Sequence, residues 1–298
     1  MLNEKSAPAI VTLTRGADRC ELVPSLGGSI ADWSVDGQAM MRRASRFSIS
    51  TNDPYGMASF PLVPYSNRIG GGSFEWEGTR QSLPRNFPPE PHSIHGVGFE
   101  RPWQVRDQAT DSVTLVLRHR PSASWPFAFE AEQRISLKEG TLLLELKAQN
   151  LGERAVPLGF GHHPYFPRGG ASLKFRAQGV WLNTEDGLPS LLVKPFEKFD
   201  YAELSSVARG EIDHCYAGWD GHAEISWLDR ALALEITAEK LPCAVVCIRN
   251  DLDAFCFEPV PHINDAINRR DREFTMPVIA PKQAFSAAIR FRAVKRPR

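Results

Sequence analysis

Two adjacent histidines are the side chains in this sequence best suited to proton transfer near neutral pH. His162 and His163 lie between Gly161 and Pro164. An unperturbed histidine has a pKa of about 6.5, so it can give or take a proton near neutrality. Pro164 favours an extended conformation for the residue before it, and neighbouring side chains of an extended segment point to opposite faces. We therefore expect one histidine to face a site and the other to be structural or solvated. The alternative is that both are ordinary strand or loop residues.

A carboxylate that could partner a histidine lies near the C-terminal end of the chain. Glu258 ends the apolar run Phe255-Cys256-Phe257. In a strand, Cys256 and Glu258 share one face, and the two phenylalanines occupy the other. A carboxylate with such neighbours is partly desolvated, and desolvation raises its pKa. Glu258 and His163 would together provide one base and one acid near neutral pH.

Three further polar residues are expected on loops or at strand ends, where they could reach the same site. They are His95, which follows a proline-rich loop over residues 83–91, and the pair Arg68 and Asp213. Loops carried on a rigid scaffold are common positions for binding and catalytic side chains.

Metal and nucleotide motifs are incomplete in this sequence. Cys243-x-x-x-Cys247 could form half of a metal site, but no second pair of ligands follows at zinc spacing. His162-His163 and His92-x-x-His95 lack the close His-x-His spacing of a cupin metal enzyme. The triplet at residues 70–72 could cradle a phosphate, yet no Gly-Lys-Ser/Thr follows, so a glycine-rich hairpin turn is the better interpretation. We expect no metal.

Strand-like alternation predicts the elements that position these residues. Apolar side chains alternate with polar ones from Phe127 to Leu137, with Gln133 as the exception, and the pattern resumes over 142–148 after a turn. A second hairpin is expected between 223–227 and 232–236. Residues 185–206 resemble a loop, and 263–268 could form one helical turn. Without a long amphipathic helix, a repeat or a linker, we expect one all-β domain over residues 1–298, folded as a sandwich or barrel.

Composition narrows the class of protein. The 298 residues include 35 Lys and Arg and 35 Asp and Glu, so the formal net charge is zero. This balance argues against binding to nucleic acid or to an anionic membrane surface. The N-terminal segment has no signal-peptide pattern, and no apolar run is long enough to cross a membrane. Five scattered cysteines favour reduced thiols and a cytoplasmic location.

The sequence resembles the aldose 1-epimerase (galactose mutarotase) family. Five segments match in the family's order and span almost the whole chain: Asn67-Arg68-Ile69 with Phe74 and Gly78; His95-Gly96; His163-Pro164-Tyr165-Phe166; Asp213-His214-Cys215-Tyr216; and Phe257-Glu258-Pro259 with Asp265-Ala266-Ile267-Asn268. Each segment alone is a weak signal, but five in order are a strong one. The resemblance implies a large single-domain β-sandwich, which agrees with the strand patterns.

The resemblance also implies a reaction and a role for each matching residue. Glu258 corresponds to the base that takes the proton of the anomeric hydroxyl, and His163 to the acid that protonates the ring oxygen. His95, Arg68, Asp213 and, in the same segment as Arg68, Asn67 correspond to substrate-binding residues. The family needs no metal or organic cofactor. A monosaccharide is the implied partner, and the protein is expected to be a monomer or a homodimer.

Departures from the family pattern leave alternatives open. Pro259 and Val97 stand where the family commonly has an amide or hydroxyl residue and a second glycine. An epimerase for a 6-phosphorylated hexose should show an extra cationic cluster, which Arg42, Arg43 and Arg46 could supply. A non-catalytic carbohydrate-binding sandwich is a further alternative, and the presence of both Glu258 and His163 argues against it.

Overall fold

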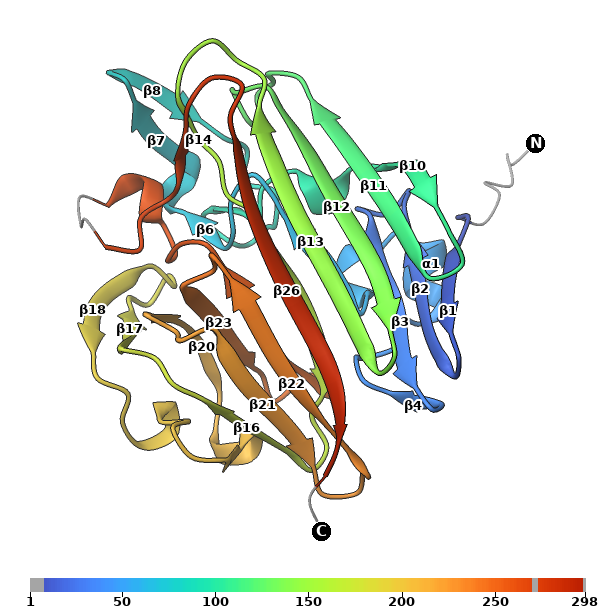
Figure 1. Cartoon of the computed structure of the whole chain (residues 1–298). Helices are drawn as coiled ribbons and strands as arrows, with labels where there is room; N and C mark the ends of the chain where they lie inside the picture. Colours follow the sequence, from blue (N-terminus) through green and yellow to red (C-terminus); the bar gives the residue numbers. More distant parts are fainter. Residues whose placement is uncertain (1–7, 270–272, 297–298) are drawn as a thin grey trace.

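The computed structural model describes residues 8–269 and 273–296, and nearly all regular structure within them is β. Two large antiparallel sheets face each other, with the nine-stranded sheet in front of the eleven-stranded one in Figure 1. The α-helix in the described residues is short, α1 at Arg46–Ser50. Among the same residues, no helix has the length and apolar character needed to span a membrane. The expected all-β sandwich is confirmed.

The larger sheet carries the strands that hold most predicted site residues. In spatial order its strands are β1 (Val11–Arg15), β2 (Asp18–Val23), β3 (Ser29–Val35), β5 (Ser59–Leu62), β15 (Gly161–Pro167), β24 (Ala254–Val260), β23 (Cys243–Ile248), β20 (Ile212–Ala217), β17 (Gly179–Asn183) and β18 (Pro189–Val193), with β4 (Gln38–Ala39) paired to β3. Among the central strands, β5, β15 and the consecutive strands β23 and β24 come from three distant parts of the chain.

The smaller sheet contains both hairpins that the alternation predicted. Its strands, in spatial order, are β10 (Gln104–Gln108), β11 (Ser112–His119), β12 (Phe129–Lys138), β13 (Thr141–Asn150), β26 (Ala284–Lys295), β22 (Leu232–Glu239), β21 (His222–Trp227), β16 (Ala171–Phe175) and β19 (Ser205–Ser206). The β12–β13 and β21–β22 hairpins confirm the two expected strand pairs.

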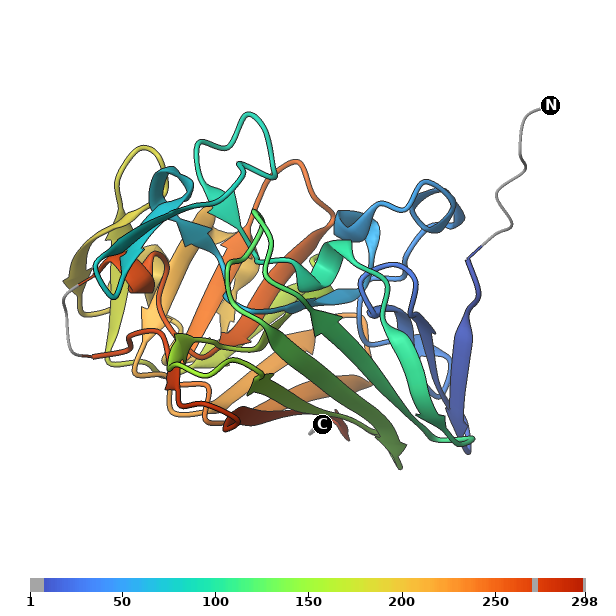
Figure 2. The same cartoon turned by 90° about the horizontal axis from the view of Figure 1, so that it is seen from above.

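Short elements connect the sheets. Three two-stranded ribbons pair β6 (Arg68–Ile69) with β9 (Ser93–Ile94), β7 (Ser73–Trp76) with β8 (Thr79–Ser82), and β14 (Val156–Pro157) with β25 (Val278–Ile279). The 3₁₀ helices are η1 (Pro54–Gly56), η2 (Gly70–Gly72), η3 (Gly98–Glu100), η4 (Glu197–Phe199), η5 (Val207–Arg209) and η6 (Ala266–Asn268). Seen from above, the loop between β8 and β9 and the segment around α1 lie across the larger sheet from the nine-stranded sheet (Figure 2).

Aromatic side chains from both sheets fill the space between them. Phe166 of β15 and Phe255 of β24 are fully buried neighbours, with ring centroids 5.8 Å apart. Phe291 of β26 reaches Phe166 from the opposite sheet at 6.2 Å. Burial of such rings is the main favourable contribution to packing two sheets together. The inner face of β15 and β24 is therefore committed to the core, and their outer face is available for a site.

Two local predictions were wrong. Residues 185–206 are not simply a loop, because β18, η4 and β19 lie within them. Leu191 and Leu192 of β18 are exposed, so this edge strand lacks the alternation that marks a half-buried strand. The triplet at residues 70–72 forms η2, and the neighbouring hairpin turns at Glu77 and Gly78 instead. The expected helical turn in 263–268 is present as η6.

Candidate active site

The registers of four neighbouring strands bring a row of polar and sulfur side chains onto the outer face of the larger sheet. Tyr165 of β15 pairs with Cys256 of β24, Cys256 pairs with Cys247 of β23, and Cys247 pairs with Asp213 of β20. Directly paired residues of antiparallel strands project to the same face. The row therefore continues across all four strands.

A second row of side chains lies on the same face, two residues further along each of these strands. It contains the predicted acid and base. Glu258 pairs with Val245, and Val245 pairs with Cys215. His163 lies on the same face of β15 as Tyr165, because the two are separated by one residue. Its Nε2 atom is 3.2 Å from Oε1 of Glu258. The structure thus brings together two residues from distant parts of the chain.

The His163–Glu258 pair is buried but retains unused hydrogen-bonding capacity. His163 is 6% exposed and Glu258 is 1% exposed. The imidazole stacks on Phe60, with centroids 4.4 Å apart and an interplanar angle of 24°, and Tyr165 flanks it at 4.7 Å. Nδ1 of His163 and Oε2 of Glu258 have no hydrogen-bond partner among the described residues. Buried polar atoms are usually paired, so these two atoms are suited to bind a ligand.

Burial sets the protonation of the pair. Desolvation raises the pKa of Glu258 well above its ordinary value, with smaller contributions from Cys247 and Asp213. Desolvation lowers the pKa of His163 well below its ordinary value, and His95 adds to this effect. Both shifts favour the neutral forms, so we infer that the two groups together hold one proton near neutral pH, and the predicted roles require that proton to lie on His163 when the sugar is bound. A pair at this distance titrates as a unit.

His162 lies on the opposite face of β15 and enters the core. Its Nε2 is 3.2 Å from Oε1 of Gln133, and its Nδ1 is 2.5 Å from Oγ of Ser59. Gln133 in turn donates to the carbonyl of Gly28 at 2.8 Å, which explains the one polar residue in the apolar pattern of β12. Burial lowers the pKa of His162 to about 3, so the ring is neutral. The expected division between the two histidines is confirmed in its geometry.

Arg68 is held in place by several acceptors. Its Nε is 3.0 Å from Oε1 of Glu90, and its Nη2 is 3.2 Å from Oδ2 of Asp213. Oδ1 of Asn67 accepts from Nη1 of Arg68 at 3.2 Å. Burial alone would lower the pKa of Arg68, but Asp213 and Glu90 outweigh it and raise the pKa. The predicted Arg68–Asp213 pair is present, and Glu90 is an additional member.

His95 is fixed by its backbone and by one ring nitrogen. Its φ is 61°, and that of Asn67 is 55°, so both residues occupy the left-handed region. Non-glycine residues in this region are uncommon and often occur at functional sites. The Asn67 amide donates to Nδ1 of His95 at 3.2 Å. Burial, with a further contribution from Arg68, lowers the pKa of His95 to about 3. The neutral ring therefore carries its proton on Nε2, where it can donate.

An open cleft lies beside Arg68 and Asp213, and its lining does not include His95, His163 or Glu258. Its volume is about 790 Å³, and Arg68, Glu90 and Asp213 line it together with Asp186 and Arg249. This volume is within the range of small-molecule sites. The Asp213 side chain is 43% exposed, whereas Arg68 is 13% exposed. Asp213 therefore offers a carboxylate oxygen to the cleft.

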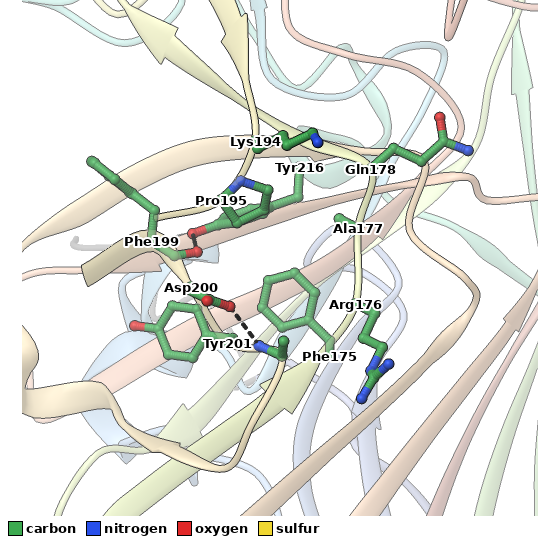
Figure 3. A pocket seen from close by; sticks show the side chains of 11 residues that line it. Phe175, Arg176, Ala177, Gln178, Lys194, Pro195, Phe199, Asp200, Tyr201 and Tyr216 are labelled. Atoms are coloured by element: carbon green, nitrogen blue, oxygen red, sulfur yellow. Dashed lines mark hydrogen bonds between the residues drawn. The ribbon is translucent and has the colours of Figure 1, made fainter. Parts of the chain in front are cut away.

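A second hollow of about 340 Å³ contains none of the predicted site residues. Phe175, Tyr201 and Tyr216 line it, and Lys194 and Arg176 lie at its edges (Figure 3). The rings of Phe175 and Tyr201 stack with centroids 5.6 Å apart. Its lining lacks a paired acid and base, so the outer face around His163 and Glu258 is the better candidate for chemistry.

The arginines proposed for a phosphate group have other contacts. Arg43 pairs with Asp32 at 2.8 Å. The guanidinium of Arg42 lies 3.8 Å from the centre of the Tyr165 ring, and its Nη2 donates to the Met57 carbonyl at 2.7 Å. Arg46 is exposed at the start of α1. Of the three, Arg42 has a contact with an aromatic neighbour of His163.

Sequence reasoning missed three contributors to this site. Glu90 lies in the proline-rich loop, and its contact with Arg68 has no local pattern. Phe60 supports His163 because β5 and β15 pair, and that pairing joins distant segments. Cys247 was considered only with Cys243 as half of a metal site, whereas its direct neighbour across the sheet is Cys256. Strand alternation had already placed Cys256 on the same face as Glu258. That signal identifies Cys256 as a neighbour of the site, but it does not identify Cys247.

Comparison with known proteins identifies the family of this chain. The model of the family described as "Aldose 1-epimerase" matches residues 9–292 of this chain. The chain belongs to the aldose 1-epimerase family. The uncharacterized protein YphB of Escherichia coli K12 is 29% identical over 270 residues, which cover 87% of this chain and 90% of YphB.

Solved structures of this family share the fold. A candidate aldose 1-epimerase from Escherichia coli K12 has a TM-score of 0.89 and 26% identity, covering 97% of this chain and 99% of that one. A galactose 1-epimerase from Lactobacillus acidophilus NCFM has a TM-score of 0.79 and 17% identity, covering 96% of this chain and 94% of that one. At that identity, the second comparison supports the fold alone.

Proposed function

We propose that this protein interconverts the α and β anomers of an aldose by acid–base opening and closing of the sugar ring. The observation that carries the proposal is the buried contact between Nε2 of His163 and Oε1 of Glu258, 3.2 Å apart. Membership of the aldose 1-epimerase family supports sugar epimerisation in general. The two partners provide the acid and the base that ring opening requires.

In this proposal Glu258 takes the proton of the anomeric hydroxyl, and His163 gives a proton to the ring oxygen. The bond between C1 and the ring oxygen breaks, leaving a free aldehyde. Rotation about the C1–C2 bond then exposes the other face of the carbonyl, and the ring closes with the roles of acid and base exchanged. A positioned acid or base typically accelerates such a step by about 10²–10⁴.

The surrounding residues would bind and orient the sugar. Asp213 would accept from ring hydroxyls, because its carboxylate is exposed at the cleft. Arg68 would hold ring hydroxyls or the ring oxygen, with Asn67 and Glu90 fixing its position. His95 would donate from Nε2 to the opening ring. Desolvation around the buried pair strengthens its interactions with the reacting atoms.

An anomer-exchange screen tests the proposal. Polarimetry or NMR would follow free aldoses and their 6-phosphorylated forms with the wild-type protein, after subtraction of the spontaneous rate in buffer. We expect turnover of at least one free aldose and its loss in Glu258→Gln. Turnover confined to phosphorylated sugars would favour the alternative epimerase. A rate no higher than buffer with every sugar would refute the proposed activity.

A further inference from the structure

A group of metal-ligating atoms overlaps the proposed acid–base pair. One ligand atom each from His163, Cys256 and Glu258 lies within 4.8 Å of the other two. All three residues are buried. Cys247 lies directly opposite Cys256 on the adjacent strand and is partly exposed. The proposed sugar chemistry uses neither thiol.

We propose that His163, Cys256 and Glu258 bind a thiophilic divalent cation such as Zn²⁺, with Cys247 as a fourth ligand, and that the bound ion inhibits the enzyme. An imidazole nitrogen, thiolate sulfur and carboxylate oxygen are all preferred Zn²⁺ ligands, and four ligands are the usual number. The residues come from adjacent strands β15, β24 and β23, so the sheet itself holds them together. Cys247 lies outside the group of three whose ligand atoms are within 4.8 Å of one another, so its side chain must move towards them to join the ion.

Unused polar atoms supply a second, independent observation. Oε2 of Glu258 and Nδ1 of His163 have no hydrogen-bond partner among the described residues, although both side chains are more than nine-tenths buried. Leaving such atoms unpaired is unfavourable, and binding of a cation by Oε2 of Glu258 removes the penalty of that atom, whereas only one ring nitrogen of His163 can bind the same ion. The site is therefore receptive to an ion as well as to a sugar.

Coordination requires deprotonated ligands. The incoming ion therefore displaces the protons of the Cys256 and Cys247 thiols and the proton of the Glu258–His163 pair, and all three protons leave to solvent. The two thiolates and the Glu258 carboxylate then outweigh the two positive charges of the ion by one. Metal binding commonly releases protons in this way.

The ion and the catalytic reaction exclude each other. Coordination occupies the atoms that would take and give protons, so the ion would act as an inhibitor and not as a cofactor. This part of the inference rests on the proposed function, whereas binding itself does not. The two are therefore measured separately.

Co²⁺ is a suitable spectroscopic probe because a cobalt–thiolate bond gives a charge-transfer absorption band. The full-length protein, kept reduced, is titrated with Co²⁺ and then with Zn²⁺ as a competitor. We expect a thiolate band that Zn²⁺ abolishes, and in Cys256→Ala a weaker band with a loss of affinity greater than the roughly 10–100-fold that removal of an outer-shell partner costs. Cys20→Ala is the matched control, since Cys20 is a buried thiol on β2, four strands from β24. It should retain the band.

Anomer exchange with added Zn²⁺ tests the second part. We expect inhibition of the wild type and of Cys20→Ala, with full recovery on adding EDTA, and no inhibition by Mg²⁺. Absence of a cobalt–thiolate band in the wild type, or an unchanged band in Cys256→Ala, would overturn the site. A bound ion that leaves turnover unchanged would overturn its placement on the acid–base pair.

A measurement on the wild type covers the case in which Cys256→Ala does not fold. The ¹¹³Cd NMR shift of the Cd²⁺-loaded protein distinguishes sulfur ligands from a set of nitrogen and oxygen ligands. A shift without sulfur coordination would refute the proposal. If no sugar is turned over, the cobalt and cadmium measurements still decide the metal site, so the two proposals fail independently.

Discussion

Replacement of the two adjacent histidines should separate stability from catalysis. Burial lowers the pKa of His162 to about 3 in the folded chain, whereas an unfolded histidine has a pKa of about 6.5. Below pH 6.5 the unfolded state therefore binds a proton that the folded state does not. The stabilising contribution of neutral His162 is complete above the unfolded pKa and is lost progressively as pH falls towards the folded pKa.

The size of this effect follows from the two pKa values. Each pH unit between them is worth about 1.4 kcal/mol, so His162 should reduce the free energy of unfolding by about 2 kcal/mol between pH 7 and pH 5. His162→Gln removes the titration while retaining a group that can reach Ser59 and Gln133. The variant will be less stable at pH 7 because the fit is poorer, but the difference between the two pH values should shrink by about 2 kcal/mol.

Urea unfolding at pH 7 and pH 5 measures this difference directly. The wild type, His162→Gln and a control, His222→Gln, are compared at matched ionic strength. His222 is exposed on β21, so its replacement should preserve the wild-type pH dependence. An unchanged pH dependence in His162→Gln would refute the assignment of a neutral, buried ring.

Activity provides the complementary comparison. His163→Asn should lower anomer exchange by about 10²–10⁴, the usual effect of removing a positioned acid or base. His162→Asn should cost much less, because its side chain points into the core and not towards Glu258. The reverse ranking would assign the acid to His162.

Four other predictions concern the chemistry. Glu258→Gln should abolish most turnover and leave sugar affinity within about tenfold, since an amide still hydrogen-bonds a hydroxyl. Asp213→Asn should chiefly weaken binding; if it were inactive while Glu258→Gln retained near wild-type turnover, the base would be Asp213. The pH–rate profile should be bell-shaped, because Glu258 must accept a proton while His163 donates one, and a monotonic profile would argue against the coupled pair. Activity should survive exhaustive chelation, so loss with EDTA and rescue by one divalent ion would contradict a metal-free reaction.

The sequence by itself determined the fold class, both major hairpins and the candidate residues. Period-two alternation reports which side chains of one strand share a face, and it separated His162 from His163 and grouped Cys256 with Glu258 correctly. These features are local, so they are visible in the residue order. The resemblance to the aldose 1-epimerase family added roles for Arg68, Asp213 and His95, which remain predictions.

Only the tertiary structure decided which segments meet. Pairing of β15 with β24, which are distant in the sequence, placed His163 beside Glu258. The strands β23 and β24 are consecutive, and the register between them placed Cys256 beside Cys247. Alternation within a strand carries no information about which distant strand will become its neighbour. That choice depends on how the complete set of apolar faces is buried between the two sheets. For the same reason the contact of Glu90 with Arg68, and the unpartnered atoms of the buried pair, appear only once the chain is folded.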